Sequence, residues 1–375
     1  MENMAINKNF WKGKKVLVTG HTGFKGAWLS LWLQSLGAEV VGVSLNVPTT
    51  PSLYEQANVS ENMISLREDI RDVVAIRKIF QDHLPEIVFH LAAQPLVRLS
   101  YREPVETYEI NVMGTLHVLE GIRSIDSVRS AVMITTDKCY QNKEWVWGYR
   151  ETDTLGGHDP YSSSKGAAEL LISSYRNSYF PQDKYSEHKT AIASARAGNV
   201  IGGGDWAEDR LIPDIIKAFK NNEKVIIRNP KSTRPWQHVL EPLSGYMLLA
   251  EDLSKNIKNH GEAFNFGPPA HQNHSVSELI VEMSKYWDQV RWNDISNNQE
   301  VLHEAGLLKL NCDKALFALQ WEPVLSFQET VKMTVDWYKE YYQSSDNSPF
   351  PNSVIQVEKY IELATKRNLS WASND

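Results

Sequence analysis

Apolar residues in the first half of the chain form short continuous runs that alternate with segments of helical spacing. The runs at residues 14–20 and 38–45 are short and rich in β-branched residues, which is typical of buried strands, and residues 25–37 between them carry apolar side chains at helical spacing. The alternation then predicts strands at 86–94, 130–136 and 190–202 and helices at 108–124 and 161–180. Strands that are apolar throughout and separated by helices indicate a parallel sheet covered on both faces. The first half therefore predicts an α/β fold with a doubly wound parallel sheet.

The alternation weakens in the second half. Prolines, tryptophans and polar loops become more frequent, notably at residues 228–239, and residues 353–369 predict an amphipathic helix. We expect residues 1–198 to form the sheet domain and residues 199–375 a smaller mixed α/β domain, with residues 236–260 returning to the first.

Composition narrows the class of protein. A chain of 375 residues with 42% hydrophobic residues is long enough for about two domains. Its net charge of −7 gives no electrostatic reason to expect a nucleic acid partner. Cys139 and Cys312 are the two cysteines, and their spacing indicates neither a disulfide framework nor a metal site. No secretory signal or run of ~18 apolar residues is present, so a cytoplasmic protein without membrane contact is expected.

Three glycines follow the first predicted strand. Gly20, Gly23 and Gly26 lie where a strand turns into a helix, so they permit a tight turn beside a helix N-terminus, which attracts a pyrophosphate. This context predicts a dinucleotide site, although ordinary glycines of a turn remain the alternative.

The spacing G-x-x-G-x-x-G resembles the extended branch of the short-chain dehydrogenase/reductase family, which implies a Rossmann-type fold that binds NAD. Further resemblances are "LREDIRD", "HLAAQ" at 90–94 and "NVMGT" at 111–115. The resemblance implies cofactor contacts from Gly20, His21, Thr22, Gly23, Phe24, Lys25, Gly26, Asp69, Ile70, Leu91, Ala92, Ala93, Asn111, Thr135, Tyr161 and Lys165. For Asn111 the alternative is a polar residue that stabilises its helix, and His21 and Lys25 either contact phosphate or are solvated.

The end of the second predicted strand departs from the usual pattern for NAD. An acidic residue about 20 positions after the glycines commonly binds the ribose hydroxyls, but this chain has Ser44, Leu45 and Asn46 there. No arginine replaces it to receive a 2′-phosphate. NAD is therefore favoured only modestly over NADP.

Tyr161 and Lys165 form a Y-x-x-x-K pair on one face of a predicted helix. A phenol is a poor base near neutral pH, but a nearby ammonium favours the phenolate. The pair can then deprotonate an alcohol while a cofactor accepts hydride, and the resemblance implies that Thr136 orients the alcohol oxygen. An exposed helical Tyr and Lys pair is the alternative.

Thr136 is followed by Asp137 and Lys138, which resembles the sugar-nucleotide 4,6-dehydratase branch of the family. That branch oxidises carbon 4 of the sugar, eliminates water across carbons 5 and 6, and returns the hydride to carbon 6. Asp137 would protonate the departing hydroxyl, and Lys138 would take the carbon 5 proton or only stabilise the enolate. The alternative for Asp137 and Lys138 is a surface ion pair. The alternatives for the protein are a 4-epimerase or decarboxylase and a silent nucleotide-sugar-binding protein.

Segments at 135–138, 196–214 and 234–239 resemble dehydratases that act on CDP-glucose, as opposed to dTDP- or GDP-sugars. The resemblance implies substrate contacts from Gln94, Asn199, Val200, Arg210, Arg234 and Trp236. Trp206 and Trp236 either stack on a base or sugar or belong to the core. A homodimer or homotetramer built through helices 104–124 and 161–180 is also implied.

Overall fold

A seven-stranded parallel sheet forms the centre of the molecule. The computed structural model describes residues 6, 8–221, 223–227, 229–287, 292–294, 307–343 and 352–372. The strand order is β3-β2-β1-β4-β5-β6-β11, and every neighbouring pair is parallel. The strands are β1 (Lys15–Thr19), β2 (Glu39–Ser44), β3 (Ile64–Arg67), β4 (Ile87–His90), β5 (Ser130–Ile134), β6 (Ala191–Ala197) and β11 (Ala263–Phe266). The predicted doubly wound parallel sheet is confirmed.

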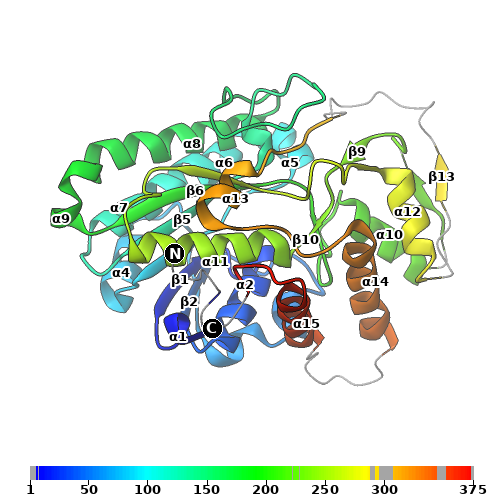
Figure 1. Ribbon diagram of the computed structural model, residues 1–375, viewed down its shortest axis with the longest axis horizontal. Coiled ribbons are helices and arrows are strands. Elements are labelled where there is room, and N and C mark those ends of the chain that lie inside the picture. The colour runs from blue at the N-terminus through cyan, green and yellow to red at the C-terminus, as the bar shows by residue number, and fades with distance from the viewer. Residues whose placement is uncertain are drawn as a thin grey trace.

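Helices cover both faces of the sheet (Figure 1). One face packs against α4 (Val73–His83), α7 (Gly114–Arg123) and α8 (Pro160–Tyr179), and the other against α2 (Phe24–Ser35) and α11 (Leu240–Lys255). Each face has its own apolar core, which explains why the central strands are buried along their whole length.

The part of the molecule beside the sheet is built of helices and very short strands, on the right of Figure 1. Its helices are α10 (Leu211–Lys220), α12 (Val276–Ser284) and α14 (Phe327–Gln343). Two-residue and three-residue strands pair as β7 (Val200–Ile201) with β10 (Gln237–His238), β8 (Val225–Ile227) with β13 (Trp292–Asp294), and β9 (Thr233–Arg234) with β12 (His274–Ser275).

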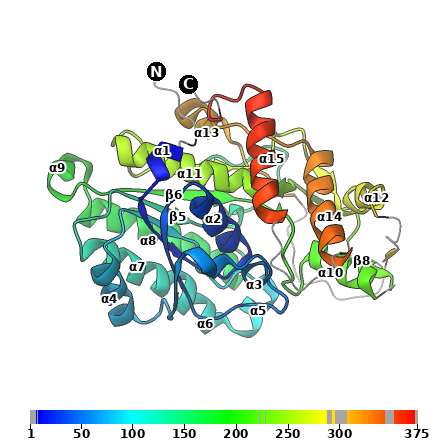
Figure 2. The same cartoon turned by 90° about the horizontal axis from the view of Figure 1, so that it is seen from below.

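Late segments of the chain return to the sheet. Strand β11 pairs with β6, and α15 (Asn352–Lys366) packs against α2, where Tyr360 meets Trp32 edge to face. Figure 2 shows α15 beside α2 and α14. The proposed domain boundary near residue 198 stays a prediction. Three elements that follow it in sequence, α11, β11 and α15, contact the sheet or the helices that cover it.

The remaining elements are short. They are α1 (Lys8–Trp11), α3 (Leu53–Gln56), η1 (Val59–Asn62), α5 (Val97–Arg102), α6 (Pro104–Tyr108), the π-helical turn η2 (Glu109–Met113), η3 (Asp137–Cys139), η4 (Gln182–Lys184), α9 (Tyr185–His188) and α13 (Asp313–Leu319). Within the described ranges, no helix combines the length and apolarity needed to cross a membrane.

Candidate active site

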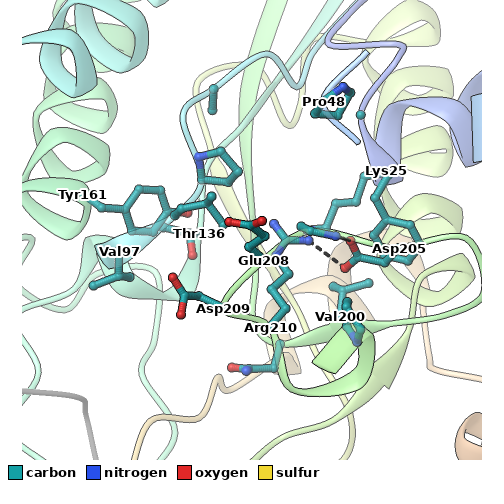
Figure 3. A pocket seen from close by; sticks show the side chains of 18 of the residues that line it. Lys25, Pro48, Val97, Thr136, Tyr161, Val200, Asp205, Glu208, Asp209 and Arg210 are labelled. Atoms are coloured by element: carbon teal, nitrogen blue, oxygen red, sulfur yellow. Dashed lines mark hydrogen bonds and ion pairs between the residues drawn. The ribbon is translucent and has the colours of Figure 1, made fainter. Parts of the chain in front are cut away.

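A cavity of about 2020 Å³ lies at the carboxyl ends of the sheet strands. Strand β1 is flanked by β4 on one side and β2 on the other, so the crossovers on its two sides run in opposite directions and leave a crevice there. Residues that follow β1, β2, β4, β5 and β6 line the cavity together with α10 and the loop before it. Figure 3 shows side chains from the sheet side and from this loop facing one another.

The glycine loop leaves no room for side chains at two positions. Gly20 has φ +78°, and a Cβ there would lie 2.7 Å from the backbone nitrogen of Ala92. A Cβ on Gly26 would lie 2.0 Å from the Gly20 carbonyl oxygen. The loop is therefore pressed between the end of β4 and the start of α2, and the backbone of residues 23–26 faces the cavity. This arrangement fits a pyrophosphate at the helix N-terminus.

His21 and Lys25, which interrupt this loop, point to different environments. His21 lies behind it, where its two ring nitrogens are 2.9 Å from Ser44 Oγ and 2.7 Å from Ser65 Oγ. Lys25 lines the cavity, and burial, reinforced by the nearby Arg210, lowers its pKa to about 7. His21 is thus a support for the loop, whereas Lys25 faces any ligand in the cavity.

The residues after β5 form a compact acid and base cluster. The Thr136 hydroxyl donates to Asp137 Oδ1 at 2.9 Å, and Lys138 Nζ lies 3.6 Å from the same oxygen. The other carboxylate oxygen of Asp137 is buried and has no hydrogen-bond partner among the described residues. It lies against Gly198, whose ideal Cβ would be 2.9 Å away. A buried oxygen without a partner is rare in structural ion pairs and is a feature of reactive sites.

Tyr161 and Lys165 enter the cavity from the first turns of α8. Asp159 caps this helix by accepting from the Ser162 backbone N–H at 2.9 Å, and Pro160 occupies its first turn. Burial raises the pKa of Tyr161 to about 12, although the Thr136 hydroxyl opposes this shift. Burial lowers the pKa of Lys165 to about 8. The exposed-pair alternative is excluded, because both side chains are more than nine-tenths buried.

Asn111 and Gln94 lie one layer behind the cavity wall. The Asn111 side chain accepts from the Gln94 backbone N–H at 2.9 Å and donates to Ser164 Oγ at 2.9 Å. The Gln94 side chain donates to Thr107 Oγ1 at 2.9 Å. These bonds tie the loop after β4 to α8 through η2, so in the structure as it stands both residues act as supports of the site.

The side of the cavity opposite Tyr161 is built by residues 199–211. Arg210 Nη1 binds Asp205 Oδ2 at 2.9 Å, and the pair is visible in Figure 3. Arg98 of α5 forms an ion pair of 3.2 Å with Asp209, which joins the sheet side to this loop. Asp205, Asp209 and Arg98 were not predicted as site residues. The acid-rich sequence around Arg210 is the signal that could have revealed the first two.

Trp206 and Trp236 both border the cavity and both are almost fully buried. Trp206 packs edge to face against Trp337 and Tyr338, and its Nε1 donates to Tyr342. Trp236 Nε1 donates to the His274 carbonyl at 3.2 Å. Trp206 is therefore mainly a core residue, and only part of either ring faces the cavity.

Most predicted site residues border this one cavity. They are Gly20, Thr22, Gly23, Phe24, Lys25, Gly26, Asp69, Ile70, Leu91, Ala92, Ala93, Thr135, Thr136, Lys138, Tyr161, Lys165, Asn199, Val200, Arg210, Arg234 and Trp236. Four do not border it, namely His21, Gln94, Asn111 and Asp137. No cluster of three or more metal-ligating side chains occurs in the part of the chain that the structure describes.

The family model described as GDP-mannose 4,6 dehydratase matches residues 17–334. The chain belongs to this family. The match contains the glycine loop and every predicted site residue, and of the residues that line the cavity only Tyr342 lies beyond it. The resemblance to sugar-nucleotide 4,6-dehydratases is confirmed.

Relatives within and around the GDP-mannose 4,6 dehydratase family cover nearly the whole chain. The chain is 52% identical to the CDP-glucose 4,6-dehydratase of Salmonella typhimurium, over 91% of its own length and 95% of the relative. It is 26% identical to the human dTDP-D-glucose 4,6-dehydratase over 90% and 95% of the two chains. Among solved structures, the UDP-glucuronic acid 4-epimerase of Bacillus cereus in complex with UDP-glucuronic acid and NAD has a TM-score of 0.74 at 25% identity, and covers 88% of this chain and 100% of that one.

Proposed function

We propose that this protein is an NAD-dependent CDP-D-glucose 4,6-dehydratase, which converts CDP-D-glucose to CDP-4-dehydro-6-deoxy-D-glucose. The observation that carries this proposal is the 52% identity to the Salmonella CDP-glucose 4,6-dehydratase over 91% of the chain. The cavity supports it, because the same space is bordered by a glycine loop, by Tyr161 and Lys165, and by the cluster after β5.

The cavity fits a dinucleotide beside a nucleotide-sugar. Its volume of about 2020 Å³ exceeds the roughly 300–1,000 Å³ of a common ligand pocket. Gly20, Gly23 and Gly26 would hold the pyrophosphate of NAD, and Asp69 and Ile70 would border its adenosine end. The chemistry that NAD supplies when bound is removal of hydride from carbon 4 of the sugar and its return to carbon 6.

Tyr161 would act as the base for the first step by accepting the proton of the carbon 4 hydroxyl. Burial opposes the phenolate, so the site must supply positive charge and hydrogen bonds to form it. The Lys165 ammonium and the Thr136 hydroxyl are the groups placed to do so. Thr136 would also hold the oxygen of the reacting alcohol.

Asp137 and Lys138 would carry out the loss of water. Oxidation of carbon 4 acidifies the proton on carbon 5, so Lys138 takes that proton or stabilises the negative charge that its removal leaves. Asp137 donates a proton to the hydroxyl that departs from carbon 6, and its unpaired buried oxygen is the atom available for this transfer. The departing water therefore consists of the carbon 6 hydroxyl and the proton from Asp137. The proton taken from carbon 5 would be given back to carbon 5 when hydride returns to carbon 6.

The opposite wall would bind the rest of the substrate. Arg210 and Arg234 would pair with the pyrophosphate, because a guanidinium binds phosphate oxygens through two parallel hydrogen bonds. Asn199, Val200 and Trp236 would border the cytidine.

Incubation with nucleotide-sugars tests this function directly. Purified protein with NAD is mixed in turn with the glucose conjugates of CDP, dTDP, GDP and UDP, and each product is weighed by mass spectrometry. We expect loss of water from CDP-glucose. An unchanged mass with a changed sugar would indicate an epimerase, and binding without turnover would indicate a silent binding protein.

We also propose that the protein forms a homodimer through α6, η2, α7 and α8, with a homotetramer as the larger alternative. Helices α6 and α8 and the turn η2 pack against one another. Val105, Tyr108, Met113 and Leu170 project from them with 38% to 69% of their area exposed. Large exposed apolar side chains gathered on neighbouring elements are typical of an interface.

The cytoplasm is the compartment we propose for this activity. Cys139 and Cys312 are both free thiols in the structure. Thiols that stay reduced fit a reducing compartment.

A further inference from the structure

Glu169 is a fully buried carboxylate that the mechanism above does not use. It lies on α8 four residues after Lys165 and eight after Tyr161, so the three side chains share one face of the helix. Arg196 of β6 binds it through two hydrogen bonds, Nε to Oε1 at 2.9 Å and Nη2 to Oε2 at 2.8 Å. Ser194 Oγ donates to Oε2 at 2.8 Å, and the Thr135 hydroxyl donates to Oε1.

These bonds connect the elements that hold every proposed catalytic residue. Thr135 is the first residue after β5, and its backbone N–H also binds the Ala195 carbonyl of β6 at 2.9 Å. The Thr136, Asp137 and Lys138 cluster follows it immediately. Glu169 therefore fixes the start of this cluster against the helix that presents Tyr161 and Lys165.

The carboxylate remains ionised in this surrounding. Burial alone would raise the pKa of Glu169, but the charge of Arg196 and the donated hydrogen bonds hold it below its ordinary value. Arg196 in turn is fixed from its other side, because its Nη1 donates to Tyr140 Oη at 2.8 Å and to the Glu151 carbonyl at 3.1 Å. Glu169 is thus a permanent negative charge beneath the floor of the site.

Lys165 lies next to that charge in an otherwise unfavourable place. Among the described residues it has no hydrogen bond or ion pair of its own. Burial lowers its pKa, and Glu169 on α8 is the largest influence that raises it, followed by Cys139 of η3. Lys25 of α2 and His90 of β4 are also near enough for the charge of Lys165 to lower the pKa of each. Of these four neighbours, Glu169 is the carboxylate that favours the ammonium.

We propose that Glu169, held by Arg196, is a positioning residue for the dehydration, which keeps Lys165 charged and Thr135 in place so that Tyr161 can ionise near neutral pH. The inference rests on the proposed function, because only that function requires Tyr161 to act as a phenolate. It adds a third group on α8 to the pair that sequence spacing reveals. Glu169 does not border the cavity, so its effect would pass through Lys165 and Thr135.

The test is the pH dependence of kcat/KM in Glu169→Gln, using the full-length protein with NAD. Glutamine keeps the shape but removes the charge, so the ammonium of Lys165 is lost at a lower pH and Tyr161 ionises at a higher one. We expect the acidic limb of the profile to move upward by about one pH unit, which is a tenfold loss at a fixed pH on that limb. At pH values above this limb, kcat/KM of the variant should return to within about threefold of the value for the unaltered protein.

Two variants separate charge from packing. Ser194→Ala removes a neutral donor to the same carboxylate, and Glu169→Asp keeps the charge, so both should retain the original position of the acidic limb. A purely structural role of Glu169 would instead lower the rate equally at every pH. That result, or an unmoved limb in folded Glu169→Gln, overturns the proposal.

Loss of the carboxylate leaves Arg196 buried without its partner, which is costly. The double variant Glu169→Gln with Arg196→Met removes both charges and provides a second folded test, checked by circular dichroism and thermal unfolding. The same upward movement of the limb is expected. If neither variant folds, the pair is a structural element and the proposal fails. The unaltered protein tests the proposed function separately. If it did not release water from CDP-glucose, the proposed function would fail before any variant was compared.

Discussion

Asp137 is the residue whose surroundings differ most from those of an ordinary ion pair. One carboxylate oxygen is shared between the Thr136 hydroxyl and the Lys138 ammonium, and the other has no partner among the described residues. Burying an oxygen in this way costs roughly 1–3 kcal/mol. That cost is recovered if the oxygen binds or protonates a substrate group that arrives in the cavity.

Replacing Tyr161 by phenylalanine tests the base of the first step. Tyr161→Phe removes one oxygen and little volume, so NAD and CDP-glucose should bind almost as before while turnover is lost. Single-turnover product analysis with calorimetric binding measures both quantities. A variant that retains more than about a tenth of the original rate, a barrier change of less than ~1.4 kcal/mol, would exclude Tyr161 as the base.

Lys138→Met tests the elimination step separately. Methionine keeps the apolar stem of the side chain and removes the amino group that would take the carbon 5 proton or stabilise the enolate, so loss of that proton should slow by at least about tenfold while substrate binding persists. Substrate carrying deuterium at carbon 5 should lose it to water much more slowly with the variant, as mass spectrometry will show. Ordinary deuterium loss would make Lys138 a bystander.

The predicted site residues divide according to the signal that revealed them. Tyr161 and Lys165 were found by a spacing that places them on one helical face, and Thr136 by its place at a strand end. Arg98 and Asp209 were missed because they are distant in sequence and meet only across the folded cavity. The orientation of His21 away from the cavity also depends on tertiary contacts, since Ser65 lies on a strand that was not predicted.

At the scale of elements, the glycine loop shows how closely backbone segments approach at the site. The turn between β1 and α2 places Gly26 against the carbonyl of Gly20, so the first turn of the helix packs directly on the end of the strand. Any side chain at Gly26 must push the helix away from the sheet and displace the backbone N–H groups that would receive the pyrophosphate.

Gly26→Ala should therefore weaken NAD binding by more than tenfold and destabilise the fold by more than ~1 kcal/mol. Gly166→Ala is the matched control in α8, because the nearest atom to its Cβ would be 3.4 Å away, and it should be neutral or stabilising by up to ~1 kcal/mol. Calorimetric titration with NAD and chemical unfolding measure the two effects. Equal behaviour of the variants would contradict the packing argument.

Helix α11 contributes a buried carboxyl group that makes stability depend on pH. Glu241 accepts hydrogen bonds from the backbone N–H groups of Val324 and Leu325 and from the Tyr360 hydroxyl. Burial outweighs these bonds and raises its pKa from 4.5 to about 7. The folded state therefore favours the protonated form. Its contribution to stability is complete below about pH 4.5 and is lost as the pH rises through about 7.

Glu241→Gln should remove this dependence. The difference in free energy of unfolding between the variant and the original protein should change by an amount on the order of 3 kcal/mol between pH 4.5 and pH 8. The variant should gain relative stability as the pH rises. Urea unfolding at several pH values measures the difference. If the difference in free energy of unfolding were constant across that range, Glu241 would have the same pKa in the folded and unfolded states.

Element prediction succeeded where periodicity was strong. The continuous apolar runs of β1, β4 and β5 were recognised, whereas β3 was missed because its residues are only partly buried or exposed. Helix α4 was also missed, although Ile76, Ile79 and Phe80 give it an apolar face. The predicted helix 108–124 contains a π-helical turn around Asn111, and such an insertion has no periodic signal.

On the scale of the whole molecule, the exposed apolar side chains are unevenly placed. Val105 on α6 and Leu170 on α8 are each more than 60% exposed, and their helices pack against each other. A stable interface commonly buries about 800 Å² on each partner, so the proposed dimer requires a face that also includes α7.

The double variant Val105→Asp with Leu170→Asp should shift the protein from dimer toward monomer by at least tenfold in dissociation constant. Size-exclusion chromatography with light scattering measures the mass of the assembly. Phe317→Asp on α13 is the control, because it also replaces an exposed apolar residue by aspartate, at a position that is 86% exposed and lies on a helix outside the proposed interface. A monomeric unaltered protein, or equal effects of both changes, would contradict the proposed interface.

The return of late segments to the sheet also has a consequence for biosynthesis. Strand β6 gains its second neighbour only when β11 has been made, and the stretch from Ala197 to Ala263 takes roughly 3–13 s at ~5–20 residues per second. During that interval the nascent chain has an open strand edge that can pair with other polypeptides. Helix α2 stays uncovered for longer, because α15, which packs against it, is near the end of the chain and is made last. We therefore expect the growing chain to bind chaperones that recognise exposed apolar segments at the ribosome.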